Sequence, residues 1–206
     1  MNADLLTHIT ELGNFLVLAT ISITLCGYFI MIGLRREALA IFLGYVTPIA
    51  VIGVLKISFY TCNTDLFGVV SPSGHAAISM GVLGMAALIL VKISRGVWKA
   101  IVPLCLIALA IIIGMSRVIL GMHTLPDVIL GFLIGTVIIV TISKIILTYQ
   151  SNRISYSPKA FHFFIFALLL ICGVGISYGV HLPSEDLMRS VAEKLRLNLE
   201  PCDPPL

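Results

Sequence analysis

Long apolar runs that lack charged residues dominate this chain of 206 residues and restrict it to one broad class of fold. Only 11% of the residues are charged, whereas soluble globular domains carry about 25%. Each run is long enough for a helix to cross a bilayer core of about 30 Å. The sequence therefore predicts an all-α, polytopic membrane bundle. We expect about six transmembrane helices, at residues 13–34, 38–55, 74–91, 100–116, 125–147 and 161–180.

The connections between these runs are too short to separate two folded domains. We therefore expect one transmembrane domain at residues 1–180, with its core at 50–147, followed by a tail at 181–206. The sequence shows no internal repeat, no metal-ligand spacing and no nucleotide-binding loop, so no metal or cofactor is expected.

Basic residues gather in one set of loops. The loops at 35–37, 92–99 and 144–160 hold eight basic residues and one acid, whereas the other face holds five basic residues and nine acids. The positive-inside rule places the first set in the cytoplasm and both termini outside. The net charge of +3 follows from this bias and does not indicate nucleic-acid binding.

The polar stretch VVSPSGHAAISMGV opens the third predicted span. Ser71 is a good helix N-cap, and Pro72 suits the first helical position. The first turn would then hold Ser73, Gly74 and His75, whose backbone N–H groups lack helical partners and attract anions. Alternatively, the stretch is an ordinary helix start with a histidine at the membrane interface.

A second polar stretch, SRVILGMHTLPD, lies between the fourth and fifth spans on the same outer face. Arg117 offers a fork of donors that suits phosphate. His123 is a candidate nucleophile or proton carrier, and Asp127 lies four residues later, where it can orient the ring. Thr124 is expected to cap the fifth helix. The alternative makes Asp127 only a capping carboxylate and Arg117 an interfacial side chain.

Lys56 ends the second predicted span on the same side. Alone it is typical of an interfacial anchor. Together, however, three helix ends would present Lys56, the Ser73–Gly74–His75 turn, and Arg117 with His123 and Asp127 to one site. Two cations and a helix N-terminus suit a phosphate, and two histidines with a carboxylate suit its transfer.

These residues make the chain resemble the type 2 phosphatidate phosphatase and vanadium haloperoxidase family, in its membrane lipid phosphatase branch. The family pattern has three blocks: Lys-x6-Arg-Pro, Pro-Ser-Gly-His, and Ser-Arg-x5-His-x3-Asp. The second block is complete at residues 72–75. The third is complete at Ser116, Arg117, His123 and Asp127.

The resemblance implies a metal-independent mechanism. His123 would attack the phosphorus and form a phosphohistidine, with Asp127 orienting its ring. His75 would protonate the leaving oxygen and then activate water. The equatorial oxygens would be held by Lys56, Arg117, Ser73 and Gly74.

The first block departs from this pattern, because Asn63 and Thr64 stand where the family has Arg-Pro. A replacement cation is sought in the amphipathic segment at 184–199, which holds Arg189, Lys194 and Arg196. One hypothesis is that a Cys62–Cys202 disulfide draws this tail across the site. The alternative is a free tail at the membrane surface with unpaired thiols.

The function implied is an extracytoplasmic lipid phosphatase, with lipid phosphates and membrane lipids as partners. For a bacterial inner-membrane enzyme, the substrates to consider are undecaprenyl diphosphate, phosphatidylglycerol phosphate, phosphatidic acid and lipid A. Lipid phosphotransfer and non-catalytic binding of a lipid phosphate remain open alternatives. A transporter is disfavoured, because neither inverted repeats nor broken spans are visible. The oligomeric state stays open, and the Gly131-x3-Gly135 pair would fit either a helix contact within one chain or a dimer face.

Overall fold

The computed structural model describes the backbone at residues 3–62, 69, 71–94, 96–147, 160–180 and 184–198. Side chains are described at 5–62, 69, 71–94, 96–146, 167–180 and 187–194. The regular elements within these ranges are all helices, which confirms the predicted all-α class.

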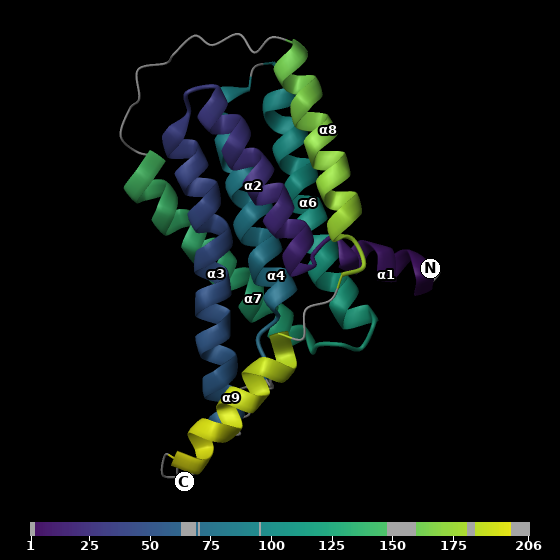
Figure 1. Ribbon diagram of the computed structural model, residues 1–206, viewed down its shortest axis with the longest axis vertical. Helices are drawn as coiled ribbons and strands as arrows, with labels where there is room; N and C mark the ends of the chain where they lie inside the picture. The colour runs from purple at the N-terminus through teal and green to yellow at the C-terminus, as the bar shows by residue number, and fades with distance from the viewer. Residues whose placement is uncertain are drawn as a thin grey trace.

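The helices follow one another in an antiparallel bundle (Figure 1). In chain order they are α1 (Ala3–Glu11), α2 (Phe15–Met31), α3 (Arg35–Cys62), α4 (Gly74–Ser79), the π-helical turn η1 (Met80–Gly84), α5 (Met85–Ile93), α6 (Trp98–Ile119), α7 (Leu125–Ile142), the π-helical turn η2 (Ser143–Leu147), α8 (Ala160–Ser177) and α9 (Ser184–Asn198).

Four of the described helices are long and apolar enough to cross a membrane: Arg35–Cys62, Gly74–Ile93, Trp98–Ile119 and Leu125–Ile146. A fifth results if the α1–α2 pair, bent by 51°, counts as one span. The apolar part of α8 within the described side chains is shorter, at Ala167–Ser177. The structure thus gives four or five candidate spans, and the expected six are not established.

The outer surfaces of these helices expose large apolar side chains, among them Ile23 on α2, Leu104 on α6 and Val137 on α7. Because a water-soluble protein rarely exposes so much contiguous apolar surface, these faces are suited to lipid. Together with the apolar spans, they identify an integral membrane protein.

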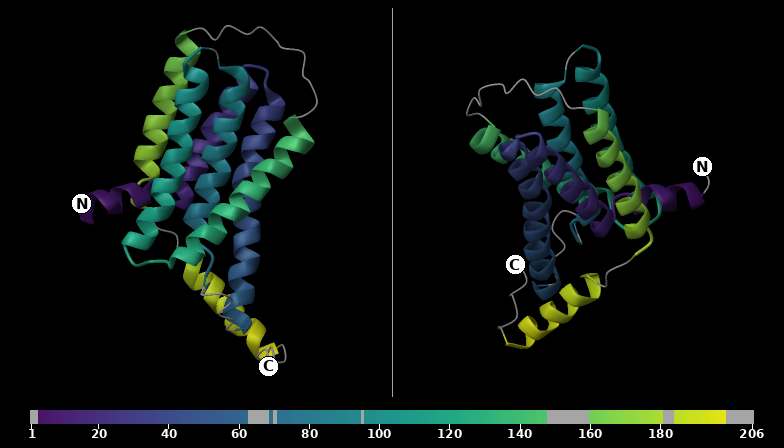
Figure 2. Two further views of the ribbon diagram at one scale, coloured as in Figure 1. Left: turned by 180° about the vertical axis from the view of Figure 1, so that it is seen from behind. Right: turned by 45° about the horizontal axis from the view of Figure 1, so that its top comes forward.

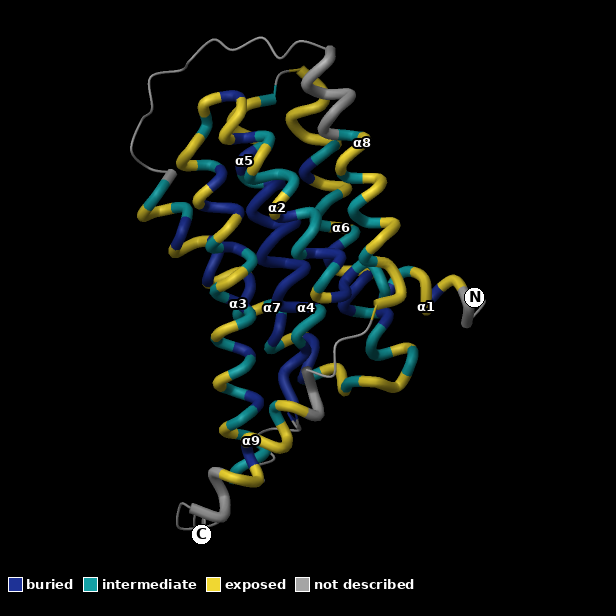
Figure 3. The backbone as a smooth tube through the Cα atoms, viewed as in Figure 1, coloured by how far each residue is buried: buried dark blue, intermediate teal, exposed yellow. Residues whose placement is uncertain are grey.

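The helix made by α4, η1 and α5 occupies the centre of the bundle, where Figure 3 shows a nearly continuous buried tube. Of its most apolar window, 72% is buried, compared with 28% in the windows of α6 and α7. Small residues allow its neighbours to approach closely. A Cβ built on Gly44 of α3 would lie 2.8 Å from the carbonyl oxygen of Gly81, so the two backbones touch.

The Gly131-x3-Gly135 pair packs α7 against the same central helix. A Cβ built on Gly131 would lie 2.6 Å from the carbonyl oxygen of Ser73, and one on Gly135 would lie 2.8 Å from that of Ala77. The pair therefore makes a helix contact within one chain, which was one of the two expectations. Asp127 precedes Gly131 by one helical turn, so this contact also sets the height of Asp127 against the start of α4.

One end of the bundle, here called the site end, holds the C-termini of α3 and α6 and the N-termini of α4 and α7. Helix α9 packs against α3 and crosses below this end, and α1 projects sideways near it (Figures 1 and 2). The opposite end carries the α2–α3 and α5–α6 connections. The structure thereby gathers the residues of both family blocks at one end.

Candidate active site

His123 and Asp127 form a close pair at the site end. His123 lies in the turn between α6 and α7, and its Nδ1 is 3.5 Å from Oδ2 of Asp127. Their side chains are only 7% and 3% exposed. A carboxylate facing Nδ1 favours the tautomer with its proton on that nitrogen, so the lone pair is left on Nε2. This is the arrangement expected of a histidine nucleophile with an orienting acid.

Asp127 has structural partners as well. It forms a capping box with Thr124: the Thr124 N–H donates to Oδ2 at 3.0 Å, and the Asp127 N–H donates to the Thr124 hydroxyl at 3.3 Å. Its other oxygen, Oδ1, accepts from the backbone N–H of Ser71 at 3.0 Å. Asp127 is therefore a cap, as one alternative had it, and also a link between α7, the loop before α4, and His123.

The start of α4 differs from the prediction by two residues. Ser71 was expected as the N-cap, with Pro72 first in the helix. In the structure Ser73 is the N-cap and accepts from the Ala76 N–H at 3.5 Å, so the helix begins at Gly74. The reason is tertiary: Asp127 binds the Ser71 N–H, and its carbonyl oxygen accepts from the Ser73 N–H at 3.1 Å. The loop is thus held extended until Ser73.

Gly74 and His75 form the first turn of α4 and are both partly exposed. A Cβ built on Gly74 would meet only Ile52, at 3.8 Å, which is ordinary contact. Packing within the chain therefore does not require glycine at this position. The His75 ring lies beside the α1–α2 turn, because a Cβ on Gly13 would be 3.1 Å from its Cδ2.

Two cations act on His123. Lys56 is only 5% exposed on α3, and Arg117 lies in the last turn of α6, where its Nη1 donates to the Thr10 hydroxyl at 3.5 Å. Burial lowers the pKa of His123 below its usual value, and the positive charges of Lys56 and Arg117 lower it further, while Asp127 opposes them. His123 is thereby favoured in the neutral form that a nucleophile needs.

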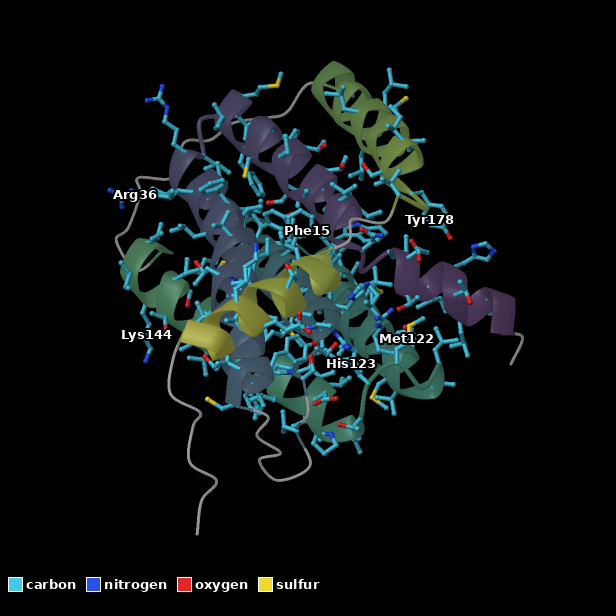
Figure 4. All side chains as sticks on the ribbon, turned by 60° about the horizontal axis from the view of Figure 1, so that its bottom comes forward. Phe15, Arg36, Met122, His123, Lys144 and Tyr178 are labelled. Carbon is cyan, nitrogen blue, oxygen red and sulfur yellow. The ribbon has the colours of Figure 1, made fainter. Side chains whose placement is uncertain are left out.

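The structure thus brings Lys56, Arg117 and Asp127 around His123, and holds Ser73 against α7. In Figure 4, which turns the site end toward the viewer, His123 lies among the side chains at that end while α9 crosses in front of the bundle. Within the described residues, no three His, Cys, Asp or Glu side chains are grouped as metal ligands.

Sequence reasoning did not foresee three contacts that support this site, although it had singled out Ser71 as a cap. Thr10 binds Arg117, Ser71 binds Asp127 through its N–H, and the Tyr60 hydroxyl lies 3.1 Å from the Ser71 hydroxyl. Only Tyr60 carried a signal, because it follows Lys56 by one helical turn and so shares its face of α3. The other two depend on contacts between distant segments.

The tail contributes a further cation. Helix α9 places the guanidinium carbon of Arg189 at 5.2 Å from the centre of the Tyr60 ring. These two residues, with Ala192 and Glu193, line a cavity of about 210 Å³. The Arg196 side chain lies outside the described residues.

Cys62, the last residue of α3, is disulfide-bonded. The described cysteines that remain free are Cys26, Cys105 and Cys172. The partner hypothesised for Cys62, Cys202, lies outside the described residues. The same holds for Asn63 and Thr64, which replace Arg-Pro.

Comparison with known proteins agrees with the motif blocks. A family model described as the PAP2 superfamily matches residues 15–151, which is more than half of the chain. No curated protein and no solved structure matches this chain. Proteins of the matched superfamily are generally phosphatases and phosphoesterases, which indicates phosphatase-type activity on phosphate esters.

Proposed function

Because this chain belongs to the PAP2 superfamily, we propose that it is a membrane lipid phosphatase that works through a phosphohistidine. It removes phosphate from a lipid monophosphate or diphosphate on the extracytoplasmic side. The observation that carries the proposal is the buried His123–Asp127 pair at one end of an apolar bundle. The positive charges of Lys56 and Arg117 act on this pair and lower the pKa of His123.

In the first step, Nε2 of His123 attacks the phosphorus while the bond to the leaving lipid oxygen breaks. The protonated His75 donates its proton to that oxygen, and Asp127 stabilises the charge that develops on the His123 ring. In the second step, His75 takes a proton from water, and the water oxygen attacks the phosphohistidine. The P–N bond breaks, inorganic phosphate leaves, and His123 and the protonated His75 are restored.

Binding and positioning supply most of the rate in phosphoryl transfer. Lys56 and Arg117 offset the negative charge of the phosphoryl oxygens. The Gly74 N–H and the Ser73 hydroxyl donate to them at the N-terminus of a helix that continues from Gly74 to Ile93. Donors held in place before the substrate arrives cost little reorganisation, so they stabilise the transition state effectively.

The lipid nature of the substrate is supported by the position of the site. His123 lies at the end of helices whose outer faces are apolar, so a head group reaches it while the acyl or prenyl chain stays among lipids. The outer location is supported by the charge bias of the sequence, since the ranges 35–37, 92–99 and 144–160, predicted to face the cytoplasm, hold eight of the thirteen basic residues.

A second candidate, a member that binds a lipid phosphate without cleaving it, is favoured by one observation. Asn63 stands where the family pattern has an arginine, and that side chain cannot supply a positive charge. Transfer to a second lipid instead of water is a variant of the main proposal and uses the same residues.

The test is phosphate release by the purified protein in detergent with EDTA, from a panel of lipid monophosphates and diphosphates. We expect release from at least one lipid by the wild type and none by His123→Ala. Folded wild-type protein that binds these lipids but releases no phosphate would favour the binding candidate. Phosphate appearing on an added lipid acceptor instead of in solution would identify a transferase.

A further inference from the structure

We propose that Arg189, carried by α9, supplies the phosphate-binding cation that the chain lacks at position 63. The inference rests on the proposed function, because it assigns a residue to the same site. Arg189 would contact the phosphate oxygens of the bound head group from outside the bundle, opposite the buried Lys56.

Lys56 and Tyr60 lie on one face of α3, near the site end. Tyr60 follows Lys56 by four residues and therefore lies one turn nearer the site end on the same face. The family pattern has its arginine seven positions after Lys56, where this chain has Asn63. Residues 57–74 contain no lysine or arginine, so the sequence supplies no other cation between Lys56 and His75.

Arg189 lies over the ring of Tyr60. Its guanidinium carbon is 5.2 Å from the centre of that ring, so α9 brings a second positive charge to the face of α3 that carries Lys56. An arginine held over an aromatic ring by a cation–π contact still has several of its five N–H donors directed away from the ring. Arg189 is exposed, and a ligand can therefore reach those donors.

Hydrogen bonds connect Tyr60 to the reacting pair, His123 and Asp127. The Tyr60 hydroxyl lies 3.1 Å from the Ser71 hydroxyl, and the Ser71 N–H donates to Asp127 at 3.0 Å. Asp127 in turn faces His123. Tyr60, the residue that Arg189 contacts, is thus linked to the Asp127 carboxylate through two hydrogen bonds.

Packing attaches α9 to the bundle. The helix lies against α3, and its Ala192 is buried. Glu193 lines the same cavity as Arg189. The cavity therefore carries one charge that attracts phosphate and one that repels it.

The experiment measures the affinity for inorganic phosphate by titration calorimetry in detergent, and kcat and KM with a hydrolysed lipid. The variants are Arg189→Ala, Arg189→Gln, Arg189→Lys, Glu193→Gln and the double variant Arg189→Ala with Asn63→Arg. Lys194→Ala is the matched control, since it removes a positive charge from the exposed surface of the same helix. Melting temperature and elution volume establish that each variant is folded.

We expect Arg189→Ala and Arg189→Gln to weaken phosphate binding about tenfold, which is the effect of about 1.4 kcal/mol. Arg189→Lys should retain part of the affinity, and Asn63→Arg should restore it in the double variant. Glu193→Gln should strengthen binding. Lys194→Ala should change it less than about twofold, because Lys194 does not line the cavity that Arg189 and Glu193 share.

The inference is overturned if Arg189→Ala binds phosphate as the wild type does, or if Lys194→Ala weakens binding equally. It is also overturned if folded wild-type protein binds no phosphate. Phosphate binding that depends on Arg189, without turnover of any lipid, would uphold the inference while the proposed catalysis fails. Turnover abolished by His123→Ala but unaffected by Arg189→Ala would do the reverse.

Discussion

The carboxylate of Asp127 accepts a hydrogen bond from the backbone N–H of Ser71 at 3.0 Å, and this contact joins two segments 56 residues apart. The same carboxylate caps α7 and faces His123. One side chain therefore both holds the fold of the site end and orients the candidate nucleophile, and substitutions at Asp127 can separate these two roles.

Asp127→Asn keeps the shape of the side chain and an oxygen that can accept from Ser71, but it removes the negative charge. We expect a folded protein whose kcat falls at least about 100-fold, because the His123 ring loses its orienting acid. Asp127→Ala should in addition cost about 1–3 kcal/mol of stability, since buried donors lose their acceptor. Phosphate release and thermal unfolding measure the two effects. Glu37→Gln, at the opposite end, is the control, and near-normal kcat in Asp127→Asn would contradict the orienting role.

The lowered pKa of His123 predicts how activity depends on pH. The attacking ring must be neutral, so activity is lost as the pH falls through the pKa of His123. Because burial and the charges of Lys56 and Arg117 lower this pKa, the acid limb of kcat/KM should lie below pH about 6.5, the usual value for histidine. Lys56→Met should move the limb to higher pH, and Lys92→Met, at the opposite end, should not. A limb at or above the usual value in the wild type would count against the assignment.

Gly131→Ala tests the contact that sets the height of Asp127. The added Cβ would meet the carbonyl oxygen of Ser73 at 2.6 Å, so the start of α4 must shift. We expect a loss of stability of about 1–3 kcal/mol and lower activity, as in other overpacked cores. Gly53→Ala is the matched control, since nothing lies within 4 Å of its added Cβ. Equal behaviour of the two variants in thermal unfolding would show that this contact does not constrain the site.

Gly74→Ala, unlike Gly131→Ala, should leave stability unchanged and weaken phosphate binding. The nearest atom to its added Cβ is 3.8 Å away, so the fold should keep its melting temperature. If a phosphate binds against the Gly74 N–H, however, the methyl group crowds it, and phosphate affinity should fall about tenfold. Titration with inorganic phosphate measures this. Unchanged affinity would place the phosphate elsewhere.

We propose that Cys62, which is disulfide-bonded, pairs with Cys202, and peptide mapping of unreduced protein would identify the partner. Such a bond would tie the tail to the end of α3 and so support phosphate binding. Cys62→Ser and Cys202→Ser should then weaken phosphate binding to the same degree, and Cys105→Ser, at a free cysteine of α6, should leave it unchanged. Different effects of the two tail-linking variants, or a mapped partner other than Cys202, would refute the pairing.

The sequence predicts much of the helical structure and several contacts of this protein, because the patterns that specify them are local. Apolar runs of sufficient length predict helices that cross a membrane, and the all-α class follows from them. The spacing of four between His123 and Asp127 lets the carboxylate reach the ring, and in the structure Nδ1 and Oδ2 lie 3.5 Å apart. The capping box of Thr124 and Asp127 is likewise a short-range pattern.

Other features were decided only when distant segments packed together. The N-cap of α4 is Ser73 and not the predicted Ser71, because Asp127, far along the chain, binds the preceding loop. Gly131 and Gly135 turned out to face the central helix of the same chain, a choice their spacing left open. The contact of Arg189 with the Tyr60 ring is likewise tertiary, since it requires α9 to return to the site end. The sequence by itself therefore determined the helical class and the candidate residues that each block carries. The tertiary structure decided which polar groups meet, because such contacts depend on packing across the bundle and not on spacing along the chain.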